Sequence, residues 1–149
     1  MTYGVTYPRL FRYARGRIKA TVGVMRAQVS VGARSLSHKR SVQTPTAEVV
    51  RFLRENLGVT LTAVLASVDP RTVARWIAGE VVPREEAEKK LRSAYQIFDL
   101  LAQQEASATV RAWFMGMNEQ LADLSPAEAI ADGNSRDVLI AARAFISYG

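Results

Sequence analysis

Hydrophobic residues recur at three- and four-residue intervals from about residue 45 to the C-terminus, a spacing that places them on one face of an α-helix. The first stripe lies between Thr44-Pro45, typical of a helix start capped by Thr44, and Gly58, typical of a helix end. We therefore expect a helix over residues 45–57 whose inner face is made of Val49, Val50, Leu53 and Leu57.

The same pattern predicts helices along the rest of the chain. Two short helices are expected over residues 61–67 and 70–78, with Thr60 and Asp69 as their caps. The longest stripe covers residues 84–104. Three more helices are expected towards the C-terminus: one that carries Trp113 and Phe114, one from Ser125-Pro126 to Asp132-Gly133, and one over residues 135–147. Ser125 and Glu128 form a capping-box pattern at the start of the second of these. The predicted fold class is all-α.

The positive charge of the chain is concentrated near its N-terminus. The 149 residues carry 20 Lys and Arg against 14 Asp and Glu, a formal net charge of +6. Residues 1–47 hold nine of the basic residues and no acidic one, which leaves 11 basic and 14 acidic residues for the rest. Such an arm is the electrostatic footprint of polyanion binding, although a solvated tail or a transit peptide has the same composition. We expect residues 1–44 to form a loose basic arm, at most a short hairpin, and Met25 offers an alternative start.

Composition excludes several kinds of chemistry. The absence of cysteine rules out disulfides, thiolate zinc sites and cysteine nucleophiles, and the single histidine, His38, lies in the basic arm. There is no glycine-rich phosphate loop, and no apolar run approaches the roughly 18 residues that span a membrane. We expect a cytoplasmic protein that is not an enzyme and uses no metal or cofactor.

Residues 61–79 carry the strongest functional signal, because two short amphipathic helices joined by a tight turn form a helix-turn-helix arrangement. The pattern turns apolar residues inward from both helices: Leu61, Val64 and Leu65 from the first, and Val73 with Trp76 or Ile77 from the second. The outer face keeps Arg71, Thr72 and Arg75, near the part of the second helix that enters the major groove in DNA-binding versions. Because arginine binds guanine edges and phosphates, we predict DNA binding by these three residues and Thr60. The competing interpretation is an ordinary helical core with solvated arginines.

Two stretches resemble a known protein family. Residues 69–83 are similar to the helix-turn-helix half of the Xre/MbcA/ParS-like antitoxins. Residues 112–121, followed by Ser125-Pro126, Asp132-Gly133 and the final helix, are similar to the C-terminal toxin-binding domain of that family. The resemblance covers about residues 46–149 and rests on separated motifs in the same order. The acid-free arm is longer than the family pattern requires.

The resemblance implies the antitoxin of a type II toxin–antitoxin system. Its partner would be a RES-domain toxin that degrades NAD and is encoded by the neighbouring gene. The antitoxin would block the active site of this toxin. It would also repress its own operon by binding operator DNA. Matching positions assign toxin contacts to Asn118, Arg136, Arg143, Phe145, Tyr148 and Gly149. For Phe145 and its neighbour Ile146, the competing interpretation is core packing on the helix of Trp113 and Phe114.

The predicted layout has three parts: a basic arm over residues 1–44, a helix-turn-helix domain with a long connecting helix over residues 45–104, and a helical toxin-binding domain over residues 105–149. Since helix-turn-helix proteins often read paired half-sites, we expect a homodimer or a larger hetero-oligomer with toxin. The alternatives are a stand-alone helix-turn-helix transcriptional regulator with a helical dimerisation domain, and a basic protein whose arm alone binds nucleic acid.

Overall fold

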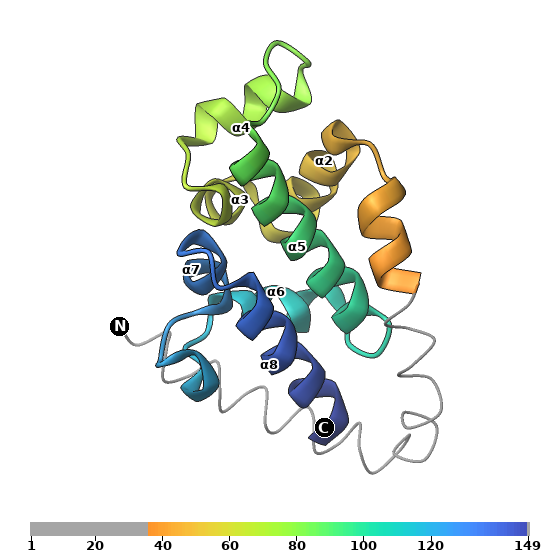
Figure 1. The fold of residues 1–149 in the computed structure, drawn as a ribbon, viewed down its shortest axis with the longest axis vertical. Coiled ribbons are helices and arrows are strands. Elements are labelled where there is room, and N and C mark those ends of the chain that lie inside the picture. Colours follow the sequence, from red (N-terminus) through yellow and green to blue (C-terminus); the bar gives the residue numbers. More distant parts are fainter. Residues whose placement is uncertain (1–35, 149) are drawn as a thin grey trace.

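The computed structural model describes residues 36–148, and over this range the chain is helical without any strand (Figure 1). The all-α fold class is therefore confirmed. After a helix over residues 36–43, the elements are α2 (Thr46–Leu57), α3 (Val59–Ala66), α4 (Pro70–Ile77), α5 (Glu85–Ala102), α6 (Ser107–Met115), the short 3-10 helix η1 (Glu119–Leu121), α7 (Pro126–Ala131) and α8 (Ser135–Tyr148). Most of the expected arm and Gly149 lie outside the described residues.

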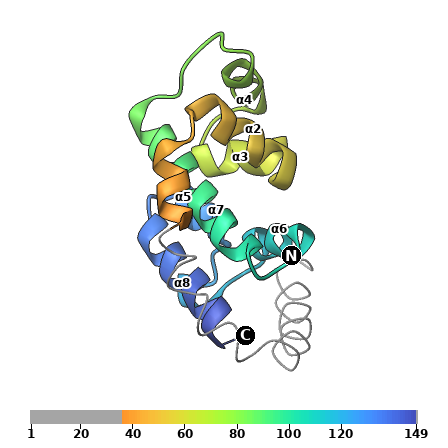
Figure 2. The ribbon, with the colours of Figure 1, turned by 90° about the vertical axis from the view of Figure 1, so that its right-hand side faces the viewer.

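The long helix α5 is the centre of the fold. It contacts α2 and α3 towards one end of the molecule and α6, α7 and α8 towards the other (Figures 1 and 2). Its buried side chains come from more than one face: Leu91, Ala94, Ile97, Phe98, Leu100 and Leu101. A helix that is apolar on several faces needs partners on each of them, which explains why α5 is surrounded.

Aromatic rings connect the helices on both sides of α5. Phe98 packs edge-on against Phe52 of α2, with ring centroids 5.3 Å apart, and lies 6.3 Å from Phe114 of α6. Trp113 continues the row to Phe145 of α8 at 6.0 Å. Buried residues from α2 to α8 thus form one continuous core. The predicted boundary at residue 104 therefore remains a proposal about which part of the chain binds which partner.

Three local predictions are wrong. Thr44 is not the cap of α2, because its hydroxyl donates to the carbonyl of Arg40 at 2.6 Å and Pro45 occupies the cap position. Thr60 does not cap the next helix, because α3 starts at Val59, directly after Gly58, and Thr60 lies exposed in its first turn. Val64 was expected to face inward but is 41% exposed. Thr62 is buried instead, and its hydroxyl is satisfied because it donates to the carbonyl of Gly58 at 2.8 Å.

Residues 36–43 are helical, whereas the sequence pattern predicted a loose segment there. The helix buries two serines one turn apart, Ser37 and Ser41, instead of an apolar stripe. Gln103 donates to the Ser37 hydroxyl at 2.9 Å, and Arg40 pairs with Asp99 at 2.8 Å. Polar contacts with α5 hold this helix, which explains why hydrophobic periodicity did not predict it.

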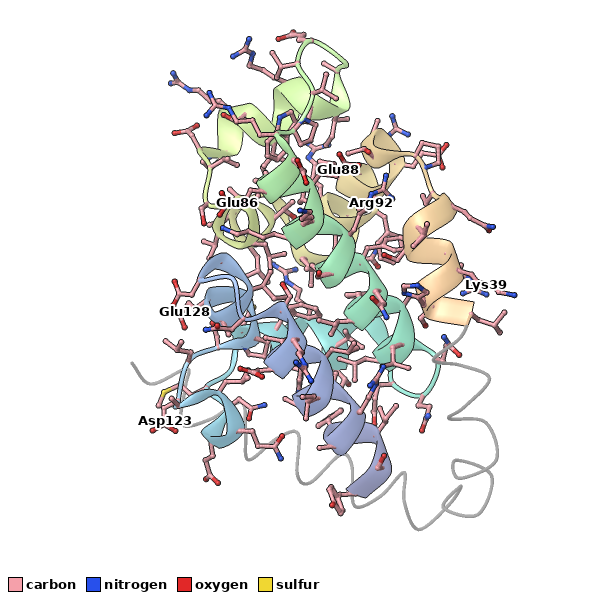
Figure 3. The ribbon with its side chains drawn as sticks, viewed as in Figure 1. Lys39, Glu86, Glu88, Arg92, Asp123 and Glu128 are labelled. Atoms are coloured by element: carbon pink, nitrogen blue, oxygen red, sulfur yellow. The ribbon has the colours of Figure 1, made fainter. Side chains whose placement is uncertain are left out.

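Arg92 of α5 joins three segments (Figure 3). Its guanidinium donates to the carbonyls of Ser41 and Thr44 at 2.6 and 2.8 Å, and to the hydroxyl of Thr46 at 2.9 Å. Glu88, one turn earlier, accepts from Arg92 at 3.0 Å and from Thr46 at 2.6 Å. The Thr46 hydrogen bond, followed by that from Arg92, holds the pKa of Glu88 below its usual value. This network attaches the 36–43 helix and α2 to α5.

Candidate nucleic-acid and partner interfaces

The turn between α3 and α4 consists of three residues, 67–69. Ser67 adopts a left-handed conformation, with φ 57° and ψ 45°. The Ser67 N–H donates to the Val64 carbonyl and the Val68 N–H to the Ala63 carbonyl, so the last carbonyls of α3 are satisfied as in a Schellman motif. Serine thus occupies a position that glycine usually takes. The turn redirects the chain and leaves neither the Ala63 nor the Val64 carbonyl unpaired.

Helix α4 starts as the sequence predicted. The Asp69 carboxylate accepts from the Arg71 N–H at 2.8 Å, and Pro70 takes the first helical position. At the other end, Gly79 with φ 75° permits the Glu80 N–H to reach the Arg75 carbonyl. A side-chain cap at the start and backbone hydrogen bonds at the end therefore fix a helix of only eight residues.

The two faces of α4 differ in chemistry. Val73 and Trp76 are buried, as predicted, and Ile77 is half-buried. Arg71 and Arg75 are exposed, and Thr72 is half-buried. The predicted outward face thus carries its two guanidinium groups towards solvent.

Sequence reasoning missed the partner of Arg75. Its Nε lies 3.3 Å from a carboxylate oxygen of Glu80, which the turn at Gly79 brings back alongside the helix. The two side chains are 56% and 60% exposed, so solvent screens the pair and it costs little to open. The Arg75 guanidinium therefore remains available to a phosphate or a base.

The final helix α8 combines a core face with a solvent face. Val138, Ala141, Ala142 and Ile146 are buried, so the core interpretation of Ile146 is confirmed. Phe145 is half-buried with its ring against Trp113. Arg136, Ile140 and Tyr148 face solvent, Ile140 with 52% and Tyr148 with 79% of its surface exposed. We call these three residues the outer α8 face.

Two predicted toxin contacts, Asn118 and Arg143, are half-buried. The Asn118 side chain accepts from the Gln120 N–H at 2.9 Å and so caps η1. Arg143 is half-buried, and its buried Nε has no hydrogen-bond partner in the described part of the chain. Ile140 was not among the predicted contacts because the helical pattern gave it no distinguishing feature; only its exposure marks it.

The α4 face and the end of α8 lie at opposite ends of the long axis of the molecule. Figure 1 shows α4 at the top and the C-terminus at the bottom, and Figure 2 shows the same separation after a quarter turn. The α3–α4 turn also lies close to α7: Lys90 of α5 donates to the carbonyl of Ala131 at 2.8 Å, and Ser67 reaches the same carbonyl at 3.5 Å. The two ends are thus separate surfaces of one packed body.

The start of α7 is fixed by a reciprocal capping box. The Ser125 N–H and hydroxyl donate to the Glu128 carboxylate at 2.9 and 2.7 Å, and the Glu128 N–H donates to the Ser125 hydroxyl at 3.2 Å. The hydroxyl and then the backbone hydrogen bond from Ser125 hold the pKa of Glu128 below its usual value. Sequence analysis predicted this cap, which positions the segment before α8.

Residues 36–148 lack the features of two other site types. This part of the chain contains no group of three or more His, Cys, Asp or Glu residues that could hold a metal ion. None of its helices has the length and apolar character to cross a membrane.

Comparison with known proteins identifies the family. The chain is 36% identical over 87 residues to the mycobacterial cidal antitoxin MbcA of Mycobacterium tuberculosis, and equally to that of Mycobacterium bovis. The matched region covers 57% of this chain and 77% of either relative. No family model and no solved structure matches the chain. An identity of this size over most of the relatives' length shows that the chain belongs to the MbcA antitoxin family.

Proposed function

We propose that this protein is a cytoplasmic antitoxin that binds a cognate toxin through the outer α8 face and operator DNA through α4. The toxin is expected to be a RES-domain, NAD-degrading protein, which the antitoxin neutralises by covering its active site. Binding to DNA represses the operon that encodes both. The protein acts by contact with other macromolecules and performs no catalysis of its own.

The exposure of the outer α8 face is the observation that supports toxin binding most directly. Tyr148 and Ile140 offer apolar surface that residues 36–148 leave in water. Tyrosine and arginine are enriched among the residues that dominate binding energy at protein interfaces. A helix with Arg136, Ile140 and Tyr148 exposed is therefore suited to a protein partner.

Arg143 adds a specific polar feature beside this face. Its buried Nε has no hydrogen-bond partner among residues 36–148, and a buried unpaired donor costs free energy. A partner carboxylate or phosphate that bound the guanidinium at the surface would pair with its positive charge. We propose Arg143 as the polar anchor, with Phe145 and Asn118 holding the surface in place from inside.

The exposed arginines of α4 support DNA binding. Arg71 and Arg75 lie on a helix fixed by caps at both ends, so their backbone positions are well defined. A planar guanidinium can meet guanine O6 and N7 together or pair with phosphate. Thr72 and Thr60 would contribute hydroxyl contacts to the DNA backbone.

The direct test is co-expression with the product of the neighbouring gene, followed by gel filtration. We expect one complex that contains both chains, survival of cells that express both, and loss of both properties for Ile140→Asp. Val42→Asp is the matched control, because Val42 is also an exposed aliphatic residue but lies on the 36–43 helix. A chain that neither co-migrates with the toxin nor protects the cells contradicts the proposal. Binding to DNA without any toxin partner would instead identify a stand-alone regulator.

A further inference from the structure

Two arginines that are far apart in the chain lie at the junction between α2 and α3. Gly58 forms this junction with φ 88°, and its N–H donates to the carbonyl of Arg54, one turn earlier, at 2.9 Å. The guanidinium of Arg111 in α6 reaches across to Gly58, and its Nη2 lies 3.4 Å from the point where a side chain of residue 58 would begin. Both arginines are exposed, and so is Thr60, the second residue of α3. We call Arg54, Thr60 and Arg111 the α2–α3 junction surface.

Neither arginine of this surface is neutralised by a neighbouring acid. Five other cations of the described chain pair with carboxylates at 2.7 to 3.4 Å: Arg40, Arg75, Lys89, Lys90 and Arg92. Within residues 36–148, no ion pair joins Arg54 or Arg111 to a carboxylate. Side chains on a helix meet those three and four positions away, and no acid occupies these positions around either arginine. Glu55 follows Arg54 directly, but adjacent helical positions do not face each other. The junction surface therefore keeps two uncompensated positive charges.

The junction surface lies on the same side of the molecule as α4. Figure 2 shows α4, α3 and α6 along one edge and α8 along the opposite edge. Trp113 of α6 has its ring 6.0 Å from that of Phe145 in α8, so this side of α6 faces α8. Arg111 comes two positions before Trp113, which places it about 200° around the helix, on the side away from α8. A duplex bound at α4 can therefore extend along this edge to the junction surface without meeting the outer α8 face.

We propose that Arg54 and Arg111 bind backbone phosphates of the DNA duplex whose major groove receives α4. A guanidinium can donate two parallel hydrogen bonds to one phosphate, and the Thr60 hydroxyl adds a donor beside them. Such contacts position a protein on a duplex but carry no sequence information, which base contacts supply. The inference deepens the proposed function and rests on DNA binding by α4. It also assigns a DNA contact to α6, which the predicted layout places in the toxin-binding part.

The experiment measures the DNA affinity of the full chain at several salt concentrations, by fluorescence anisotropy. The probes are the DNA upstream of the gene and an unrelated duplex of the same length. Arg54→Ala and Arg111→Ala should each reduce the magnitude of the slope of log K against log salt by about 1, and the double variant by about 2. Each variant should lose affinity for the two duplexes by the same factor, because phosphates are common to both.

Three controls isolate the effect of a phosphate contact. Arg54→Lys and Arg111→Lys should keep the salt slope of the wild type, because they keep the positive charge. Arg136→Ala removes an exposed arginine from α8 and should bind both duplexes like the wild type. Because Arg54 and Arg111 are exposed, the helical circular dichroism spectrum of every variant should match that of the wild type.

Arg75→Ala separates this inference from the proposed function. It removes the predicted base contact and should weaken binding to the upstream DNA more than to the unrelated duplex. If it does so while both junction variants behave like Arg136→Ala, DNA binding by α4 stands and the inference is wrong. Loss of toxin binding by the junction variants with unchanged DNA binding would place this surface in the toxin interface and contradict the inference. A wild type that binds neither duplex would overturn the proposed DNA binding and the inference together.

Discussion

The two ends of the molecule present surfaces of different chemistry. At the α4 end, an eight-residue helix is fixed by caps at both ends and carries exposed arginines. At the other end, the 14-residue α8 is fixed by side-chain packing and leaves a tyrosine and an isoleucine exposed beside its arginines. The first surface depends on charge and the second on apolar contact. We expect salt to weaken binding at the α4 end far more than at the α8 end.

The largest expected effect is at the α8 end. Ile140→Asp should lower the affinity for toxin by about 2–4 kcal/mol, because it places a carboxylate in the centre of a contact surface. Isothermal titration calorimetry measures this change. DNA binding should be unchanged; an equal loss of both activities would show that the two surfaces are not separate.

Arg92→Ala should lower the free energy of unfolding by about 2–3 kcal/mol, because it removes charged hydrogen bonds to two carbonyls and to Thr46. Urea unfolding measures the loss. Arg92→Lys should recover only part of it, because an ammonium group cannot reach all of these acceptors. The folded fraction of either variant should still bind both partners, and selective loss of one would assign Arg92 to a surface.

At the α4 end, Arg75→Ala should weaken specific DNA binding by about 1–3 kcal/mol if the guanidinium pairs with a base. A fluorescence anisotropy titration with the DNA upstream of the gene measures the change. Arg136→Ala is the matched control, since it removes an exposed arginine from α8. Equal effects of the two substitutions on DNA binding would contradict the assignment of DNA to α4.

A smaller effect comes from the capping box before α8. Ser125→Ala should destabilise the fold by about 1 kcal/mol at neutral pH. The pKa of Glu128 is lower in the folded chain than its usual value of 4.5, so the contribution of its carboxylate is complete above pH 4.5 and is lost as the pH falls through the folded pKa. The stability difference between Ser125→Ala and wild type should therefore shrink on acidification, and a constant difference would show that Glu128 is not involved.

The smallest change is expected at the α3–α4 turn. Ser67→Gly should stabilise the fold by about 0.5–1 kcal/mol, because glycine adopts the left-handed conformation without the steric cost that serine has there. Thermal unfolding measures the gain. Lower stability would mean that the contact from Ser67 to the Ala131 carbonyl outweighs the backbone cost.

Much of the fold could be predicted because its signals are local. The cap at Asp69, the capping box at Ser125 and the apolar stripes of α2 and α5 depend on residues within a few positions of each other. The same holds for the separation of Val73 and Trp76 from Arg71 and Arg75 on α4. Periodicity and capping chemistry therefore predicted the candidate DNA-binding face.

The remaining features depend on contacts between distant residues. Ser37 and Ser41 are buried, and their hydroxyls form hydrogen bonds with Gln103 and with the Arg92 carbonyl. An apolar stripe cannot predict such contacts. The burial of Thr62 in place of Val64 depends on a helix start that Gly58 sets. The exposure of Ile140 depends on which face of α8 meets α5, so only the packed structure distinguishes it from Ile146.

In the proposed arrangement, DNA and toxin bind at opposite ends of one chain. Sedimentation velocity with fluorescently labelled DNA from upstream of the gene, the antitoxin and a catalytically inactive toxin tests it most directly. We predict a single ternary complex in which adding toxin leaves the DNA bound. Release of the DNA as toxin saturates the antitoxin, at a stoichiometry that shows competition for one surface, would contradict the account.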